Sequence, residues 1–188
     1  MDVKAHLHAA LRAGREAVVW KLDGLSEYDA RRPLLPSGTN LVGLVKHLAG
    51  VEAGYFGSTF GRPFPEHLPW FADDAQPEDD MWARPGESRD DLVALYRRVW
   101  AHADATIEAL GLDARGEVPH WPEPRRHVTL GQVLVHVVAE THRHAGHADA
   151  VRELVDGAAG RHPGDPNAPA DTGHRDRVEA AARALRPG

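Results

Sequence analysis

The sequence predicts an all-α protein, an antiparallel four-helix bundle with long inter-helix loops and a short C-terminal helix. Four stretches of about 20 residues carry apolar side chains at helical spacing, and helices with one apolar face are what such a bundle requires. No stretch alternates convincingly between apolar and polar residues. We therefore expect no sheet.

Residues typical of helix ends bound each stretch. The four predicted helices cover about residues 3–22, 41–60, 88–110 and 129–156. Their candidate N-terminal caps are Asp2, Thr39 or Asn40, Ser88 and Thr129, the last in a capping-box pattern with Gln132. Gly111 and Gly157 supply the stops of the last two helices.

Two connections are longer than a minimal bundle needs. Residues 61–87 contain Trp70, Trp82 and an acidic patch, and residues 111–128 carry a basic run that includes Arg125 and Arg126. Loops of this length are usually functional or disordered, and the tryptophans favour packing against the helices as a lid.

Two parts of the chain differ in composition. We expect one domain over residues 1–157. A Gly- and Pro-rich tail over 158–188 follows, and its short helix, about 175–185, is expected to pack on or beside the bundle.

Composition excludes several classes of function. The chain has 188 residues, a formal net charge of −6 and no cysteine. Disulfides, thiolate metal sites and cysteine nucleophiles are therefore excluded, and the acidic balance argues against binding to nucleic acid. The N-terminal residues lack the features of a signal peptide, and no apolar run is long enough to span a membrane. We expect a cytoplasmic protein without a membrane partner.

The fourth predicted helix carries His136, Glu140, His144 and His147 on one side. At about 100° per residue, these four side chains fall within about 80° of one another. The apolar side chains of the same helix, Val133 and Val137 among them, point in the same direction. Several ionisable groups facing a core cost several kcal/mol unless something pairs with them, and a divalent metal satisfies them together.

A third ligand must come from another element, and His47 is the candidate. On its helical wheel it lies beside Leu44, Val51 and Tyr55, so it also faces the core. A lone histidine in such a place is more often a buried, hydrogen-bonded core residue. Together with Glu140 and His144, however, it completes a three-ligand composition common for catalytic zinc, and one that also suits Fe(II) or nickel.

For His136 and His147, the sequence leaves open whether they bind the metal or lie next to the residues that bind it. Other metal and hydrolase motifs are absent: the chain has no HExxH, HxxEH or GxSxG sequence, and the residue three after Glu140 is Arg143, not the histidine of a di-iron bundle. His6 and His8 are interpreted as surface residues.

Two segments resemble a known family. TNLVGLVKHLAGVEAGYF on the second predicted helix and VLVHVVAETHRHAGHADAVRELVDG on the fourth resemble the DinB-like metalloprotein superfamily, and in particular its mycothiol-transferase-like subfamily. The resemblance covers about residues 1–157. It implies a DinB-like four-helix bundle with one metal, held by His47, Glu140 and His144. Glutamate at position 140 is similar to the mycothiol-dependent maleylpyruvate isomerase branch.

The resemblance implies thiol activation. A divalent metal, zinc first and nickel or iron as alternatives, would turn a low-molecular-weight thiol such as mycothiol into a thiolate that attacks a small electrophile. No protein nucleophile takes part, the long loops shape the electrophile pocket, and Arg125 or Arg126 contacts an anionic group of the substrate. His136 and His147 stay candidates for residues that contact the ligands.

Two other functions stay open at this stage, a metal-dependent hydrolase and a non-catalytic metal-binding, stress-related protein. The expected partners are a small thiol and an electrophile, without nucleic acid or membrane, and a homodimer is one candidate assembly.

Overall fold

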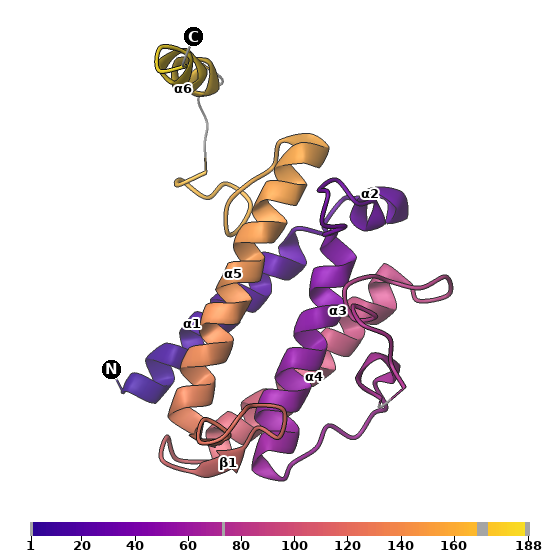
Figure 1. Cartoon of the computed structure of the whole chain (residues 1–188), viewed down its shortest axis with the longest axis vertical. Helices are drawn as coiled ribbons and strands as arrows, with labels where there is room; N and C mark the ends of the chain where they lie inside the picture. The colour runs from indigo at the N-terminus through magenta and orange to yellow at the C-terminus, as the bar shows by residue number, and fades with distance from the viewer. Residues whose placement is uncertain (1, 73, 169–172, 187–188) are drawn as a thin grey trace.

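The structure is a computed structural model that describes residues 2–72, 74–168 and 173–186. It is mostly helical with one small two-stranded sheet. The long helices are α1 (Val3–Trp20), α3 (Leu41–Glu52), α4 (Arg89–Ala109) and α5 (Leu130–Asp156), and the short ones are α2 (Glu27–Arg31) and α6 (His174–Arg183). The four long helices lie side by side (Figure 1).

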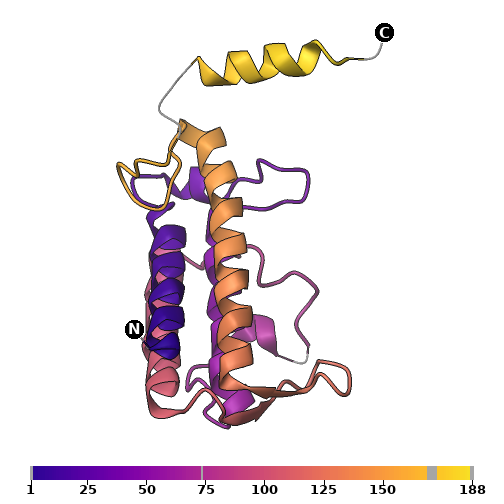
Figure 2. The same cartoon turned by 90° about the vertical axis from the view of Figure 1, so that its left-hand side faces the viewer.

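Helices α1 and α5 run in one direction and α3 and α4 in the other (Figures 1 and 2). Helix α1 packs along α5 and α3 along α4, so these neighbours are parallel, while α3 and α5 are antiparallel. A strictly antiparallel order was expected from the sequence. The parallel α3–α4 pair requires a connection that returns along the full length of α3, and residues 61–88 make that return.

The polar caps form as predicted for three of the four long helices. The side chain of Asn40 accepts a hydrogen bond from the amide of Gly43, and that of Ser88 does the same at the start of α4. Thr129 and Gln132 form a complete capping box at the start of α5. The Asp2 side chain, by contrast, makes no capping hydrogen bond to α1.

The prediction that there is no sheet was wrong. Strands β1 (Arg115–Glu117) and β2 (His127–Thr129) pair antiparallel, with Gly116 opposite Val128. Three-residue strands are too short to show a period-two pattern. Gly116 lies so close to the 3-10 turn Ser58–Phe60 that a β-carbon there would come within 2.6 Å of the Thr59 carbonyl oxygen. The hairpin therefore closes this end of the molecule.

Helix α3 continues past Glu52 in a π-helical turn, Ala53–Gly57, and a 3-10 turn, Ser58–Phe60. Two apolar clusters fill the space between the long helices. They include Leu44, Leu48, Val99, Ala148 and Val151 in one, and Leu11, Phe56, Ile107, Val133 and Val137 in the other. Both α3 and α5 thus turn apolar faces inward, next to the predicted ligands.

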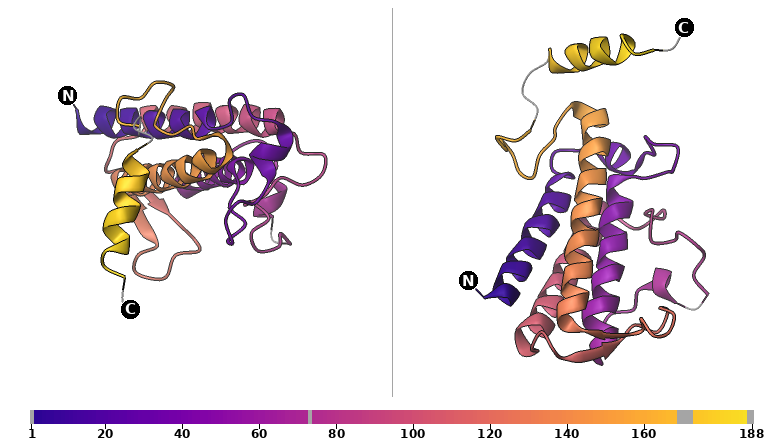
Figure 3. Two further views of the ribbon diagram at one scale, coloured as in Figure 1. Left: turned by 90° about the horizontal axis from the view of Figure 1, so that it is seen from above. Right: turned by 60° about the vertical axis from the view of Figure 1, so that its left-hand side comes forward.

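Helix α6 buries none of its residues and lies beyond the C-terminal end of α5 (Figures 1 and 3). The division into a domain over 1–157 and a tail over 158–188 stays a prediction. Within the described ranges, no helix combines the length and apolar character needed to cross a membrane.

Candidate metal centre

The three predicted ligands come together between α3 and α5. His47 lies on α3, and Glu140 and His144 lie one turn apart on α5. One ligand atom from each lies within 4.8 Å of the others. Glu140 Oε1 is 2.9 Å from Nε2 of His144 and 3.5 Å from Nε2 of His47. The carboxylate therefore stands between two imidazoles, on the apolar side of both helices.

Burial and charge set the ionisation of this group. Burial raises the pKa of Glu140, but the two histidines outweigh that effect and the pKa is lowered. Burial, with His47 nearby, lowers the pKa of His144. A charged carboxylate and a neutral imidazole are the forms in which these side chains bind a metal. Two imidazole nitrogens and one carboxylate oxygen fit a divalent cation such as zinc, iron or nickel.

The carboxylate of Asp80 contacts the second ring nitrogen of His47. Its Oδ2 is 2.6 Å from His47 Nδ1, so the imidazole lies between two carboxylates. Burial lowers the pKa of His47, but Asp80 and Glu140 together raise it. The contact with His47 lowers the pKa of Asp80. Sequence reasoning missed Asp80, because it lies in the 61–87 connection, where no periodicity assigns a side chain to a face.

The two histidines left open by the sequence lie in different places. Nδ1 of His147 is 3.3 Å from Nδ1 of His144, so His147 contacts a candidate ligand on the side away from Glu140. The ring of His136 packs instead against those of Tyr55 and Trp121, with centroids 4.9 and 5.2 Å apart. Neither residue belongs to the three-residue group found within the described residues.

A cavity of about 440 Å³ opens beside the candidate ligands. His47 and Glu140 form part of its wall, and most of the remainder is apolar or aromatic. The rest of the lining is Gly50, Val51, Gly54, Tyr55, Ser58, Thr59, Phe71, Val118, Pro119, His120 and His136. A small apolar molecule could therefore reach the side of the ligands that faces the cavity.

Tyr55 lines this cavity, and neighbouring side chains fix the position of its hydroxyl. It accepts a hydrogen bond of 3.1 Å from the indole nitrogen of Trp121 and lies 3.5 Å from Nε2 of His120. Burial raises the pKa of Tyr55, so its hydroxyl stays protonated at neutral pH. It can donate a hydrogen bond to a molecule in the cavity.

Arg125 and Arg126 do not line this cavity. The guanidinium of Arg125 lies over the ring of Trp121, 5.5 Å from its centroid. Arg126 donates to the carbonyl of Pro119 and lies 3.6 Å from the carboxylates of Glu117 and Glu123. A role for either arginine in holding a substrate anion stays a prediction.

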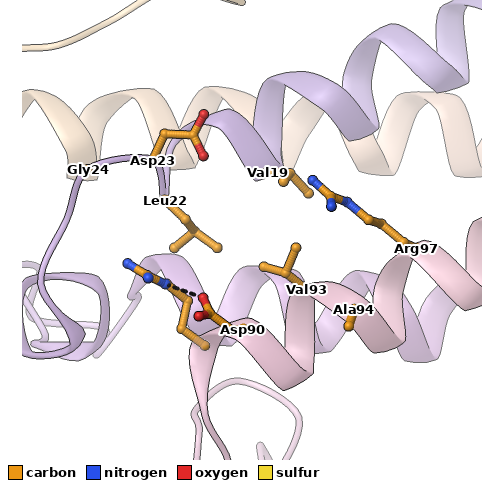
Figure 4. A pocket seen from close by; sticks show the side chains of 9 residues that line it. Val19, Leu22, Asp23, Gly24, Asp90, Val93, Ala94 and Arg97 are labelled. Carbon is orange, nitrogen blue, oxygen red and sulfur yellow. Dashed lines mark hydrogen bonds and ion pairs between the residues drawn. The ribbon is translucent and has the colours of Figure 1, made fainter.

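Another cavity, of about 290 Å³, lies between α1 and α4 (Figure 4). Aliphatic side chains and charged residues line it, including Val19, Val93 and Arg97. Arg89 and Asp90, on its edge, form an ion pair with each other. It contains none of the three candidate ligands, so the chemistry is expected at the α3–α5 site.

A family comparison agrees with this geometry. The family model described as mycothiol-S-transferase matches residues 6–157, which include all four long helices except the first three residues of α1. The chain therefore belongs to the mycothiol-S-transferase family. No curated protein matches it.

Proposed function

We propose that this chain is a divalent-metal-dependent S-transferase that joins mycothiol to a small electrophile. One observation carries the proposal: His47, Glu140 and His144 converge, and the first two line a mainly apolar cavity, in a chain of the mycothiol-S-transferase family. The proposal includes a DinB-like four-helix bundle made by α1, α3, α4 and α5. It also includes a cytoplasmic location.

The donor set favours zinc as the metal, with nickel and iron as alternatives. A divalent cation held by His47, Glu140 and His144 would supply a Lewis acid that lowers the pKa of a thiol by several units. The two helices hold these side chains together before any metal binds, because α3 and α5 pack through their apolar faces. Such preorganisation reduces the entropy lost on binding.

The nucleophile must come from the thiol cosubstrate, because the chain has no cysteine. The thiol loses its proton to solvent, and its sulfur forms a bond to the electrophilic carbon. The bond from that carbon to the leaving group breaks, and the leaving group departs with the electron pair. Val51, Tyr55 and Phe71 would hold the electrophile in the cavity beside the ligands.

The test incubates zinc-loaded protein with mycothiol and a bimane or haloalkyl electrophile and measures the S-conjugate by mass. We expect enzyme-dependent conjugate that requires both metal and thiol, with a rate that saturates as thiol concentration rises. His6→Ala, at an exposed position of α1, serves as the control and should conjugate at the wild-type rate.

Two outcomes would contradict the proposal. Hydrolysis of an ester or amide without any thiol conjugation would favour the metal-dependent hydrolase. Stoichiometric metal without either activity, across a panel of thiols that includes mycothiol, would favour a metal-binding protein without catalysis.

A further inference from the structure

The last part of the 61–87 connection is fastened to α3 at several points. The side-chain amide of Asn40 donates to the carbonyl of Met81 at 3.0 Å. Nζ of Lys46, a buried side chain, donates to the carbonyl of Trp82 at 3.0 Å and pairs with Glu87 at 2.9 Å. Backbone and side-chain contacts therefore fix this segment against the helix that carries His47.

Gly43 allows the segment to come so close. A β-carbon at this position would lie 1.8 Å from the carbonyl oxygen of Met81, so only glycine fits there without a shift of backbone. Asp80 is the residue before Met81. Because the backbone on its C-terminal side is fixed, its carboxylate has a defined place next to Nδ1 of His47, at 2.6 Å.

We propose that Asp80 is a positioning residue for His47: it holds the proton on Nδ1 and aims the Nε2 lone pair toward Glu140 and His144. This inference rests on the proposed function only for the presence of a metal at the site. It assigns to the 61–87 connection a part in metal binding beyond forming the cavity wall.

Asp80 and Nδ1 of His47 are complementary as hydrogen-bond acceptor and donor. An ionised carboxylate can only accept, so the nitrogen facing Asp80 must carry the hydrogen. Neutral imidazole has one N–H. The contact of Nδ1 with Asp80, at 2.6 Å, is much shorter than that of Nε2 with Oε1 of Glu140, at 3.5 Å, so the hydrogen is assigned to Nδ1 and the Nε2 lone pair is left for a metal. A partner of this kind fixes both the tautomer and the ring orientation of a metal-binding histidine, and its loss typically weakens metal affinity by 10–100-fold.

The experiment measures zinc affinity by competition with a chelator in the full chain, for Asp80→Ala, Asp80→Asn and Asp80→Glu. We expect about 10–100-fold weaker binding in Asp80→Ala. Asp80→Asn should lose less, because an amide oxygen still accepts from Nδ1, and Asp80→Glu should recover part of the loss. The cobalt absorption spectrum should change in Asp80→Ala, since the ring orientation of His47 changes.

Two further variants separate positioning from a general effect on the fold. Asp74→Asn is the matched control, an exposed carboxylate of the same connection whose side chain makes no hydrogen bond or ion pair within the described residues. Gly43→Ala leaves the carboxylate intact but should push Met81 away from α3 and weaken zinc binding as well. The unfolding temperatures of the metal-free variants show whether each still folds.

The role of Asp80 can be overturned in three ways. Wild-type affinity and an unchanged cobalt spectrum in folded Asp80→Ala would overturn the inference and leave the proposed function standing. Failure of the wild-type protein to bind any divalent metal would overturn both. Should Asp80→Ala fail to fold, Asp80→Asn and Gly43→Ala carry the test, and wild-type affinity in both would again overturn the inference.

Discussion

At the residue scale, Glu140 is the charged group on which the candidate site depends. One of its oxygens approaches both imidazoles, and these contacts keep it ionised although the side chain is partly buried. Among the described residues, the side chains at hydrogen-bond distance from its carboxylate are the imidazoles of His47 and His144. A divalent cation would bring the positive charge that the arrangement lacks.

The ligand set predicts a graded loss of metal. His144→Ala should remove most of the metal, because it deletes a ligand atom, and Glu140→Gln should keep the fold but bind zinc more weakly, because a neutral amide is a poorer ligand. Metal content of purified protein measures both effects. His136→Ala, on the same helix, is the control and should keep its metal. Full occupancy in a variant lacking all three ligand side chains would show that the metal binds elsewhere.

The helical wheel predicted these three residues because they lie on regular helices, where spacing fixes direction. The interpretation of His8 as a surface residue was wrong. His8 is buried on α1 and lies 2.7 Å from Asp104 of α4. The partner is distant in sequence and its position depends on how α1 and α4 pack. Asp80 was not predicted because it lies in a connection without periodicity.

At the element scale, the 61–87 connection forms one wall of the site. Its Phe71 packs on α3 at Gly50, where a β-carbon would lie 1.8 Å from the phenyl ring. Phe71 lines the 440 Å³ cavity beside the ligands and also a neighbouring cavity of about 480 Å³. The two cavities share Phe71, Gly50, Gly54 and Ser58, so the phenyl ring lies at their boundary.

The position of Phe71 predicts its effect on substrate size. Phe71→Ala should join the two cavities, so the ratio of kcat/KM for a long electrophile to that for a short one should rise several-fold. Gly50→Ala should displace the same ring and act in the same direction. Zinc affinity should stay unchanged in both, and Trp82→Ala, in the same connection but in neither cavity lining, is the control. An unchanged ratio in Phe71→Ala would show that the ring does not limit substrate size.

The sequence predicted the long helices well because three of them have a start signal whose side chain caps the helix, at Asn40, Ser88 and Thr129. It did not predict α2 or the β1–β2 hairpin, whose few residues carry too little periodic pattern. The return path of residues 61–88 was also unpredicted. It follows from the parallel packing of α3 and α4, which is a property of the tertiary structure.

At the scale of the whole molecule, metal binding and folding should be coupled, because the ligands come from two helices that meet only in the folded chain. A metal that binds only the folded state adds about 4 kcal/mol to its stability at a thousandfold excess over Kd. We expect chelation to lower the Tm by several degrees and zinc to restore it. A melting curve that stays the same after verified metal removal would mean that the site does not contribute to folding stability.

A buried network of charges also joins the helices. Arg15 of α1 binds Glu52 of α3 in the interior, and the hydroxyl of Tyr96 on α4 donates to the same carboxylate at 2.9 Å. Arg15 also donates to Asp104 of α4 at 2.6 Å. Burial raises the pKa of Glu52, while Arg15 acts against that rise. The network therefore ties three helices together only as long as its carboxylates stay ionised.

Asp104 gives this network a pH dependence of definite sign. Burial opposes its ionisation, but Arg15 and His8 outweigh burial and lower its pKa below the ordinary value of 3.8. A carboxyl group whose pKa is lower in the folded state binds its proton more weakly there than in the unfolded chain. It therefore stabilises the fold fully above about pH 4, and this contribution is lost as the pH falls through the folded-state pKa.

Asp104→Asn should accordingly be less stable than the wild type at pH 7, because Arg15 loses the charge of one of its two partners. Urea unfolding at pH 7, 5, 4 and 3 would measure the difference. We expect the same difference at pH 7 and 5 and a smaller one below about pH 4, where the wild-type carboxylate becomes protonated as well. Asp74→Asn should follow the wild type throughout. A difference for Asp104→Asn that stays constant down to pH 3 would show that its effect arises from packing, not from charge.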